Sequence, residues 1–161
     1  MTATVRAQWM PLVRLGTLLL NDRAVAEEVV QHACETVWKQ QPAVGSSAQL
    51  GAYLRTSVVN GSRSVGRRRT TAARYLALVR AEQPDGEPPA DAELLLDEDR
   101  REIRAAVGRL PDRQREVLVL RYWGRLSEAD IAQTLDISPG TVKSTAHRAI
   151  AALRAHLKEQ S

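Results

Sequence analysis

The stretch that decides the fold is SEADIAQTLDISPGTVKSTAHRAI, residues 127–150. Ser127 and Ser138 each stand directly before a segment with helical spacing of apolar residues, and serine is favoured immediately before the first turn of a helix. Pro139 suits the first helical position, because the N–H that proline lacks would have no partner there. The stretch therefore predicts two helices joined by a short turn at residues 136–138.

The apolar residues of these segments indicate how the two helices pack. Large apolar residues stand at 131, 135, 137 and 142, and the small Ala132 stands where the helices would cross. This pattern matches a helix-turn-helix, whose second helix enters the major groove of DNA. The turn usually carries glycine where this chain has Asp136, because the backbone there tends to adopt positive φ. Aspartate tolerates that conformation better than most residues.

The second helix of the pair carries polar and basic residues opposite its apolar ones. We expect Val142, Ala146 and Ile150 to point inward. Hydroxyl groups, a lysine and an arginine suit contacts with phosphates and base edges. The residues expected to face DNA are Thr141, Lys143, Ser144, Thr145, His147 and Arg148. The alternative is the solvated face of an ordinary helical hairpin, which fits His147 taken alone equally well.

Helical periodicity also covers most of the remaining chain, and no segment alternates with a period of two, so the sequence predicts an all-α fold. Segments with helical spacing are residues 12–19, 22–40, 48 onward, 103–110 and 111–123. The apolar stripe of 22–40 runs from Ala26 to Trp38. Residues suited to helix starts are Asp22, Ser47 and Pro111.

A proline-rich acidic stretch, QPDGEPPADAE at residues 83–93, divides the chain. It has almost no large apolar residues, which is typical of a linker. We therefore expect two small helical domains, residues 1–82 and 98–161, joined by a flexible acidic linker at 83–97. An irregular loop inside one domain is the alternative.

Charge is separated along the sequence. The 161 residues carry a net charge of +4, which by itself favours a polyanionic partner only weakly. Residues 55–80 contain seven arginines and no acid, whereas residues 83–99 contain seven acids and no base. Blocks of one sign are typical of interaction faces or tails rather than of ordinary solvated surface.

Several classes of protein are disfavoured. Cys34 is the single cysteine, so an intrachain disulfide is impossible and a reducing compartment is expected. The apolar run PLVRLGTLLL is interrupted by Arg14 and is too short to span a bilayer, so we expect a cytoplasmic protein without membrane insertion. Common catalytic motifs are missing, and the three histidines share no ligand spacing. We expect no metal, no cofactor and no enzymatic activity.

These motifs, in this order, resemble the extracytoplasmic-function (group IV) sigma factors of the sigma-70 family. LPDRQREVLVLRYWGRLSEADIAQTLDISPGTVKSTAHRAIAALR, residues 110–154, is similar to region 4 of that family, with the character of an actinobacterial SigE-like subgroup. LVRLGTLLLNDRAVAEEVVQHACETVWKQ, residues 12–40, resembles regions 2.1 and 2.2. AYLRTSVVNGSRSVGRRR, residues 52–69, resembles regions 2.3 and 2.4.

The resemblance implies a subunit that directs RNA polymerase to promoters, with a β′ clamp contact and −10 melting in region 2, and −35 and β-flap contacts in region 4. It also implies an anti-sigma factor as a regulatory partner. By position, the polymerase-binding residues are Glu27, Glu28, Gln31 and Trp38. The −10 residues are Asn60, Arg63, Ser64, Arg67, Arg68 and Arg69, of which the arginines are expected to contact phosphates.

Some positions depart from the family's usual pattern. An acid is usual at His32, a large apolar residue at Cys34, and an Asp or Asn near Ser64. An arginine is common at Thr145 and a leucine at Ala146, so base preference at −35 is expected to differ. The main rival is a helix-turn-helix repressor or activator whose N-terminal lobe dimerises. An enzyme is the third reading.

Overall fold

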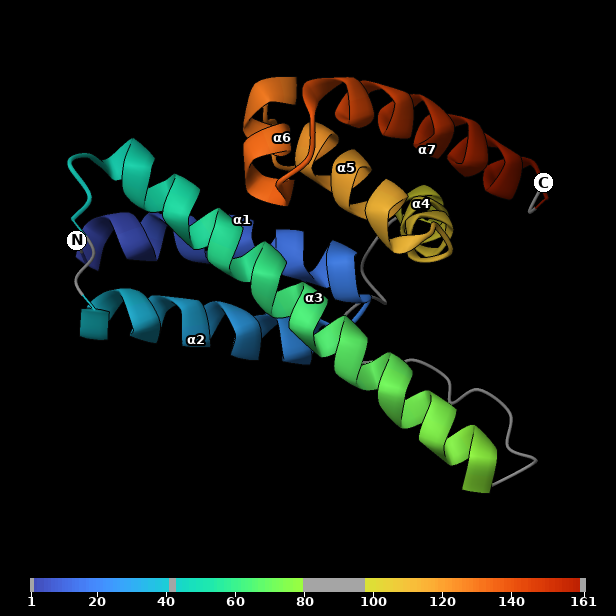
Figure 1. The fold of residues 1–161 in the computed structure, drawn as a ribbon, viewed down its shortest axis with the longest axis horizontal. Helices are drawn as coiled ribbons and strands as arrows, with labels where there is room; N and C mark the ends of the chain where they lie inside the picture. The colour runs from blue at the N-terminus through green and yellow to red at the C-terminus, as the bar shows by residue number, and fades with distance from the viewer. Residues whose placement is uncertain (1, 41–42, 80–97, 160–161) are drawn as a thin grey trace.

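The structure is a computed structural model that describes residues 2–40, 43–79 and 98–159 (Figure 1). Helices are the only regular elements in those ranges, which confirms the predicted all-α fold. The elements are α1 (Thr2–Leu20), α2 (Arg23–Gln40), α3 (Ser47–Val79), α4 (Glu98–Gly108), α5 (Asp112–Tyr122), α6 (Glu128–Leu135) and α7 (Pro139–Glu159). The predicted linker at 83–97 lies outside the described residues.

Helices α1, α2 and α3 form the first bundle, with a core of leucine, valine and alanine. The backbone N–H of Val25 donates to Asp22 Oδ1 at 3.1 Å, so Asp22 starts α2 as predicted. At the start of α3, Ser46 rather than Ser47 is the cap, because the N–H of Gln49 donates to Ser46 Oγ at 3.2 Å. Fully buried members of this core include Leu12, Val30, Leu54 and Val58.

Helices α4 to α7 form the second bundle. Pro111 lies one residue before the first residue of α5 and acts as its N-cap, so the expected first helical position is off by one. Fully buried members of this core include Leu110, Leu118, Ile131, Leu135 and Val142. Ile131, Leu135 and Val142 come from the apolar stripes of α6 and α7. Leu110 lies between α4 and α5, and Leu118 belongs to a run of α5, residues 117–120, that is buried at every position.

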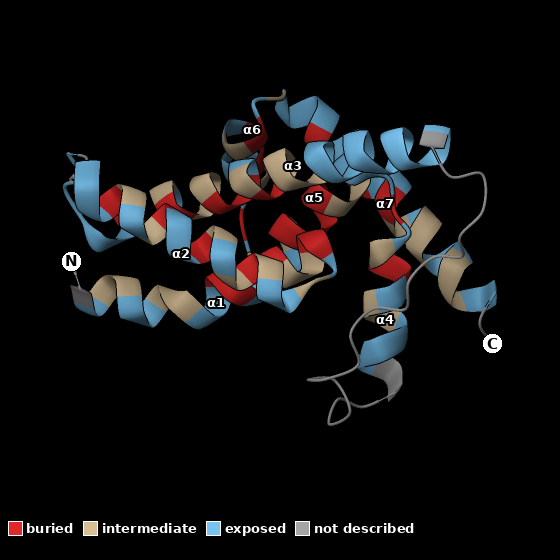
Figure 2. Ribbon diagram, turned by 90° about the horizontal axis from the view of Figure 1, so that it is seen from below, coloured by how far each residue is buried: buried red, intermediate tan, exposed pale blue. Residues whose placement is uncertain are grey.

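The two bundles pack against each other through a shared apolar cluster. Leu15, Leu19 and Val59 of the first bundle belong to the same buried cluster as Val107 and Val117 of the second. Helix α1 contacts α4 and α5, and α3 contacts α6. Figure 2 shows buried residues on α1, α3 and α5 where the bundles meet. The core is therefore continuous between the two parts of the chain.

The C-terminal half of α3 projects away from both bundles (Figure 1). From Arg67 to Leu78 every side chain on this helix is exposed. The described helices include none with the length and apolarity needed to cross a membrane.

Candidate nucleic-acid interface

The predicted helix-turn-helix is present as α6, a turn and α7. Ser127 Oγ accepts from the N–H of Asp130 at 3.1 Å, which caps α6. Asp136 has φ 55° and ψ 51°, the left-handed conformation expected at that position of the turn. Ser138 Oγ accepts from the N–H of Thr141 at 3.1 Å and is 2.8 Å from Thr141 Oγ1. The local signals at Ser127, Asp136 and Ser138 are confirmed.

Buried side chains hold α7 on α6. Ile131, Ala132 and Leu135 of α6 are buried in one cluster with Val142, and half-buried Ile137 of the turn packs against it. The N–H of Ile137 also donates to the carbonyl of Ala132 at 3.0 Å. The small side chain of Ala132 therefore lies in the packed junction, as the sequence pattern predicted.

The outer face of α7 presents five of the six residues expected to contact the −35 element. Exposed side chains are Thr141, Lys143, Ser144, His147 and Arg148. Thr145 is only 3% exposed, so its expected position on the DNA-facing side is wrong. The buried stripe follows the spacing 142, 145, 146 and 149, which is the i, i+3, i+4, i+7 pattern of a helix face packed on its neighbours. Thr145 carries a polar hydroxyl group, so the sequence pattern did not identify position 145 as part of the buried stripe.

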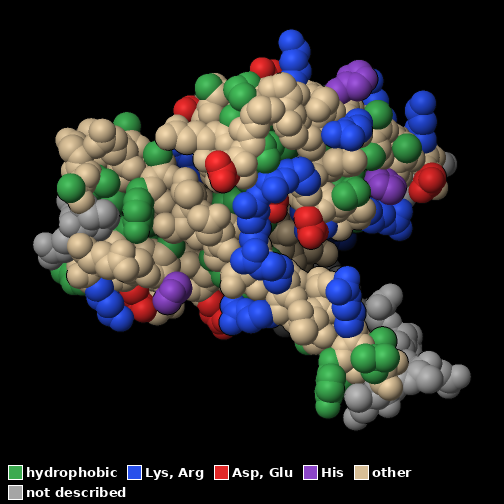
Figure 3. All heavy atoms as spheres, in the orientation of Figure 1, with side chains coloured by type: hydrophobic (Ala, Val, Ile, Leu, Met, Phe, Trp, Pro, Cys, Tyr) green, Lys and Arg blue, Asp and Glu red, His purple; other side chains and the backbone are tan. Residues whose placement is uncertain are grey.

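The residues expected to contact the −10 element all lie on α3. Asn60, Arg67, Arg68 and Arg69 are exposed, whereas Arg63 and Ser64 are partly buried. Arg69 donates from Nη1 to the carbonyl of Leu20 at 3.0 Å and from Nη2 to Asp22 Oδ2 at 3.1 Å. Figure 3 shows a band of Lys and Arg side chains at the centre of the molecule.

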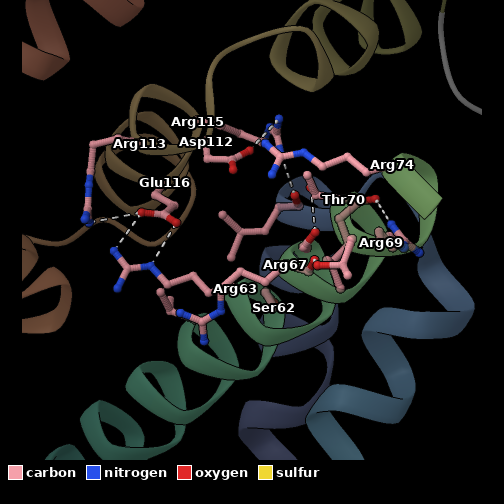
Figure 4. A pocket seen from close by; sticks show the side chains of 15 residues that line it. Ser62, Arg63, Arg67, Arg69, Thr70, Arg74, Asp112, Arg113, Arg115 and Glu116 are labelled. Atoms are coloured by element: carbon pink, nitrogen blue, oxygen red, sulfur yellow. Dashed lines mark hydrogen bonds and ion pairs between the residues drawn. The ribbon is translucent and has the colours of Figure 1, made fainter. Parts of the chain in front are cut away.

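Arg63 is already engaged with the second bundle. Its Nε and Nη2 donate to the two carboxylate oxygens of Glu116 on α5, each at 2.9 Å (Figure 4). Arg113 donates to the same carboxylate at 3.2 Å. The hydrogen bond to Glu116 raises the pKa of Arg63 above its ordinary value. Among the described contacts of the six residues expected at −10, the hydrogen bonds of Arg63 are the ones that join the two bundles.

Arg115 strengthens the same junction and was not singled out from the sequence. Its guanidinium donates to the carbonyl of Leu19 at 3.0 Å and to that of Leu110 at 2.8 Å. Leu19 is in the last turn of α1, where helix carbonyls lack partners within the helix, and Leu110 lies two residues beyond the end of α4. Glu116 was also missed. The signal available was an acid directly beside the apolar run VLVL, residues 117–120, but its partner is 53 positions away.

The expected polymerase-binding residues lie on α2. Glu28 and Gln31 are exposed, and Trp38 has 62% of its surface exposed although its spacing had placed it on the apolar stripe. Glu27 is partly buried and pairs with Arg23 at 3.0 Å. The departures from the family pattern lie on the same helix. His32 is exposed, and Cys34 is half-buried in the first bundle, where burial raises the pKa of its thiol.

A metal centre has no support in the described ranges, which contain no group of three or more His, Cys, Asp or Glu residues able to hold an ion. The geometry is that of a protein surface suited to nucleic acid, with an exposed polar helix face on one bundle and a band of arginines on the other.

Comparisons with known proteins agree with this geometry. The family model "Sigma-70, region 4" matches residues 100–153. The chain is 34% identical over 161 residues to RNA polymerase sigma-E factor of Streptomyces antibioticus, covering 96% of this chain and 82% of that protein. It is 34% identical over 157 residues to ECF RNA polymerase sigma factor SigL of Mycobacterium tuberculosis, covering 92% and 83%.

A solved structure has a similar arrangement. The sigma factor RpoE of Bartonella quintana, in a co-crystal with the anti-sigma factor NepR, matches with a TM-score of 0.71 and 25% identity, covering 98% of this chain and 93% of that one. Together with the relatives, the helix-turn-helix and the arginine-rich α3, this match leads to one assignment. The chain belongs to the extracytoplasmic-function family of RNA polymerase sigma factors.

Proposed function

We propose that this sigma factor reads the −35 promoter element with α7 and the −10 element with α3 while bound to core RNA polymerase. The observation that carries the proposal is the division of α7 into two faces. Val142 and Ala146 are buried against the rest of the bundle, while Lys143 and Arg148 are exposed on the opposite side. A basic, exposed face on the second helix of a helix-turn-helix is suited to the major groove.

The −35 set consists of the exposed residues only. Lysine and arginine suit phosphates, and arginine also suits the guanine edge; short hydroxyls accept and donate at either. The side chain of Thr145 is buried on the face of α7 that packs against the rest of the bundle, so it is left out of this set. The proposed −35 residues are Thr141, Lys143, Ser144, His147 and Arg148.

The −10 set follows α3. Exposed arginines in a row suit the phosphates of a single strand, and polar residues beside them suit one flipped base. The proposed residues are Asn60, Arg63, Ser64, Arg67, Arg68 and Arg69. We assign −10 recognition to residues 1–82, −35 recognition to residues 98–161, and the connection to 83–97.

The two reading helices are too close together in this structure to reach both elements at once. Elements centred near −35 and −10 lie about 25 base pairs apart, or about 85 Å along B-DNA. Helix α3 contacts α6, and α6 contacts α7, so α3 and α7 approach each other within about two interhelical spacings, or about 20 Å. We infer that promoter binding separates the bundles and releases Arg63 from Glu116.

Helix α2 is the proposed contact with the β′ clamp, and the second bundle is the proposed contact with the β flap. Support for the first comes from Glu28, Gln31 and the exposed ring of Trp38, which share one helix with partly buried Glu27. A large exposed aromatic ring rimmed by polar residues is typical of a protein interface.

Regulation and location follow from these partners. The Bartonella neighbour is in complex with an anti-sigma factor, and we propose a partner of that class for this chain. A protein that works on core polymerase and chromosomal DNA acts in the cytoplasm, and it contributes binding rather than catalysis.

Run-off transcription with purified core polymerase tests the proposal. Core plus this chain is expected to give a promoter-dependent transcript that core alone does not give. A chain that yields no such transcript, yet binds duplex DNA by itself as a dimer, would support the repressor or activator reading instead.

A further inference from the structure

A cleft lies where α3 faces α5, between the two bundles (Figure 4). Its volume is about 740 Å³, which falls within the range of about 300–1,000 Å³ common for small-molecule sites. Arginines dominate its walls, and acids are few. The charged residues lining it are Arg63, Arg67, Arg69, Arg74, Arg113, Arg115, Asp112 and Glu116.

The two acids leave much of this positive charge unbalanced. Glu116 is shared between Arg63 and Arg113, and Asp112 lies 3.5 Å from Arg115. Arg69 pairs with Asp22, which is not itself a lining residue. Six arginines against these three carboxylates leave three positive charges in excess at the cleft. Like charges held close together destabilise a packed arrangement, and a bound anion relieves that repulsion.

Arg67 and Arg74 are the free cations of this cleft. Among the residues that the structure describes, neither side chain makes a hydrogen bond or ion pair. They are seven residues apart on α3, which is two turns and about 10 Å along the helix axis. The planar guanidinium of arginine binds phosphate with two parallel hydrogen bonds. Two guanidinium groups at this spacing suit a ligand with several linked phosphates better than a ligand with one phosphate.

Ser62 gives an independent indication of a ligand. It lines the cleft and is only 5% exposed, yet its Oγ has no hydrogen-bond partner among the described residues. Buried hydroxyl groups in folded proteins nearly always have a partner, because an unpaired one is costly. The Oγ is covered in this rotamer, so a ligand oxygen in the cleft would supply the missing partner after a turn about χ1 toward the cleft.

We propose that the cleft binds a small molecule carrying two or more linked phosphates, the class to which nucleoside polyphosphates belong. Arg67 and Arg74 bind its phosphates, Ser62 Oγ hydrogen-bonds to it, and the α5 arginines close the opposite wall. Because both walls contribute, the ligand binds only while the bundles are packed, and it therefore stabilises that arrangement. Binding does not depend on the proposed promoter function, although a bound ligand would withhold Arg67 from DNA.

Isothermal titration calorimetry of the full chain with inorganic tripolyphosphate, at physiological ionic strength, tests the site. The variant R67A/R74A removes two exposed arginines whose side chains make no hydrogen bond or ion pair among the described residues, so the chain should remain folded. Its matched control is R109A/R154A, which removes the same charge from two exposed arginines outside the cleft. The expected result is at least tenfold weaker binding in R67A/R74A and a change within twofold in the control.

Ser62→Ala serves as a second variant, with an expected loss of a few-fold in affinity and no loss of thermal stability. Equal weakening in both double variants, or no binding by the unaltered chain, would overturn the proposal. So would a site that binds a single-stranded oligonucleotide but not tripolyphosphate or ATP. If the chain binds tripolyphosphate but does not support run-off transcription, only the proposed promoter function fails.

Discussion

Arg63 of α3 and Glu116 of α5 form an ion pair with two parallel hydrogen bonds, each 2.9 Å long, across the junction of the two bundles. One partner is a residue expected to contact the −10 element, and the other lies on α5 of the bundle proposed to bind the −35 element. The pair therefore links the helix proposed to read the −10 element to the bundle proposed to read the −35 element, and under that proposal it must break for both elements to be read together.

Replacing Glu116 with glutamine is expected to weaken this junction. Arg63 and Arg113 would then face each other without a carboxylate between them, and we expect the free energy of unfolding to fall by about 2 kcal/mol. Urea denaturation measures the change. Glu27→Gln removes one partner of the exposed pair with Arg23, where we expect a loss below about 0.5 kcal/mol. Equal losses in the two variants would mean that Glu116 does not hold the bundles together.

Asp136 has φ 55°, a conformation that glycine adopts without steric cost. Asp136→Gly is therefore expected to be more stable than Asp136→Ala by about 1 kcal/mol, because alanine lacks both the freedom of glycine and the local hydrogen bonding of aspartate. Thermal denaturation of the two variants checks the difference. An alanine variant as stable as the glycine variant would argue against a left-handed residue in the turn.

Lys143 and Arg148 are expected to contribute to DNA binding, whereas Thr145 is not. Lys143→Ala and Arg148→Ala should each weaken binding to a −35 duplex by about 1–3 kcal/mol if the contact is to a base, and less if it is to a phosphate. Thr145→Val keeps the buried volume nearly constant and should leave DNA affinity unchanged. Fluorescence anisotropy with a labelled duplex measures all three. If Thr145→Val bound the duplex more weakly while its stability was unchanged, Thr145 would have to contact DNA, contrary to this account.

Burial raises the pKa of the Cys34 thiol, so the thiol stays protonated to a higher pH in the folded chain than in the unfolded one. Only the thiolate reacts with alkylating reagents, so folded Cys34 should react more slowly than the urea-unfolded chain between pH 7 and 9. The same shift stabilises the folded state below the unfolded pKa of the thiol, and that contribution is lost as the pH rises through the folded pKa. Equal alkylation rates in the folded and unfolded chain would contradict the burial of this residue.

Local features of the fold were predictable because local chemistry determines them. Ser127 and Ser138 cap helices through bonds to residues three positions ahead, and the conformation of Asp136 depends on its immediate neighbours. The exposed side of α7 followed from periodicity, except at Thr145. Periodicity assigns each residue to the buried or the exposed face by its polarity. A residue with a hydroxyl group on the buried face is therefore predicted to be exposed.

The packing of the two bundles was not predictable in the same way. Nothing near Arg63 in the sequence indicates that its partner is Glu116, because the pairing depends on how two separate helices dock. The charge blocks were visible, but their use to line a cleft was not, since α5 contributes arginines from outside the basic block. Trp38 shows the converse error, because it is an apolar residue at core spacing and yet 62% of its surface is exposed.

The most direct test of the central claim is transcription from the genomic DNA of the host with purified core polymerase, followed by mapping of the 5′ ends. With this chain added, the mapped start sites should share one −35 and one −10 sequence at fixed spacing. K143A/R148A should lose those start sites, while the charge-matched R109A/R154A keeps them. Start sites with no shared upstream sequence, or unchanged starts in K143A/R148A, would contradict promoter reading through α7.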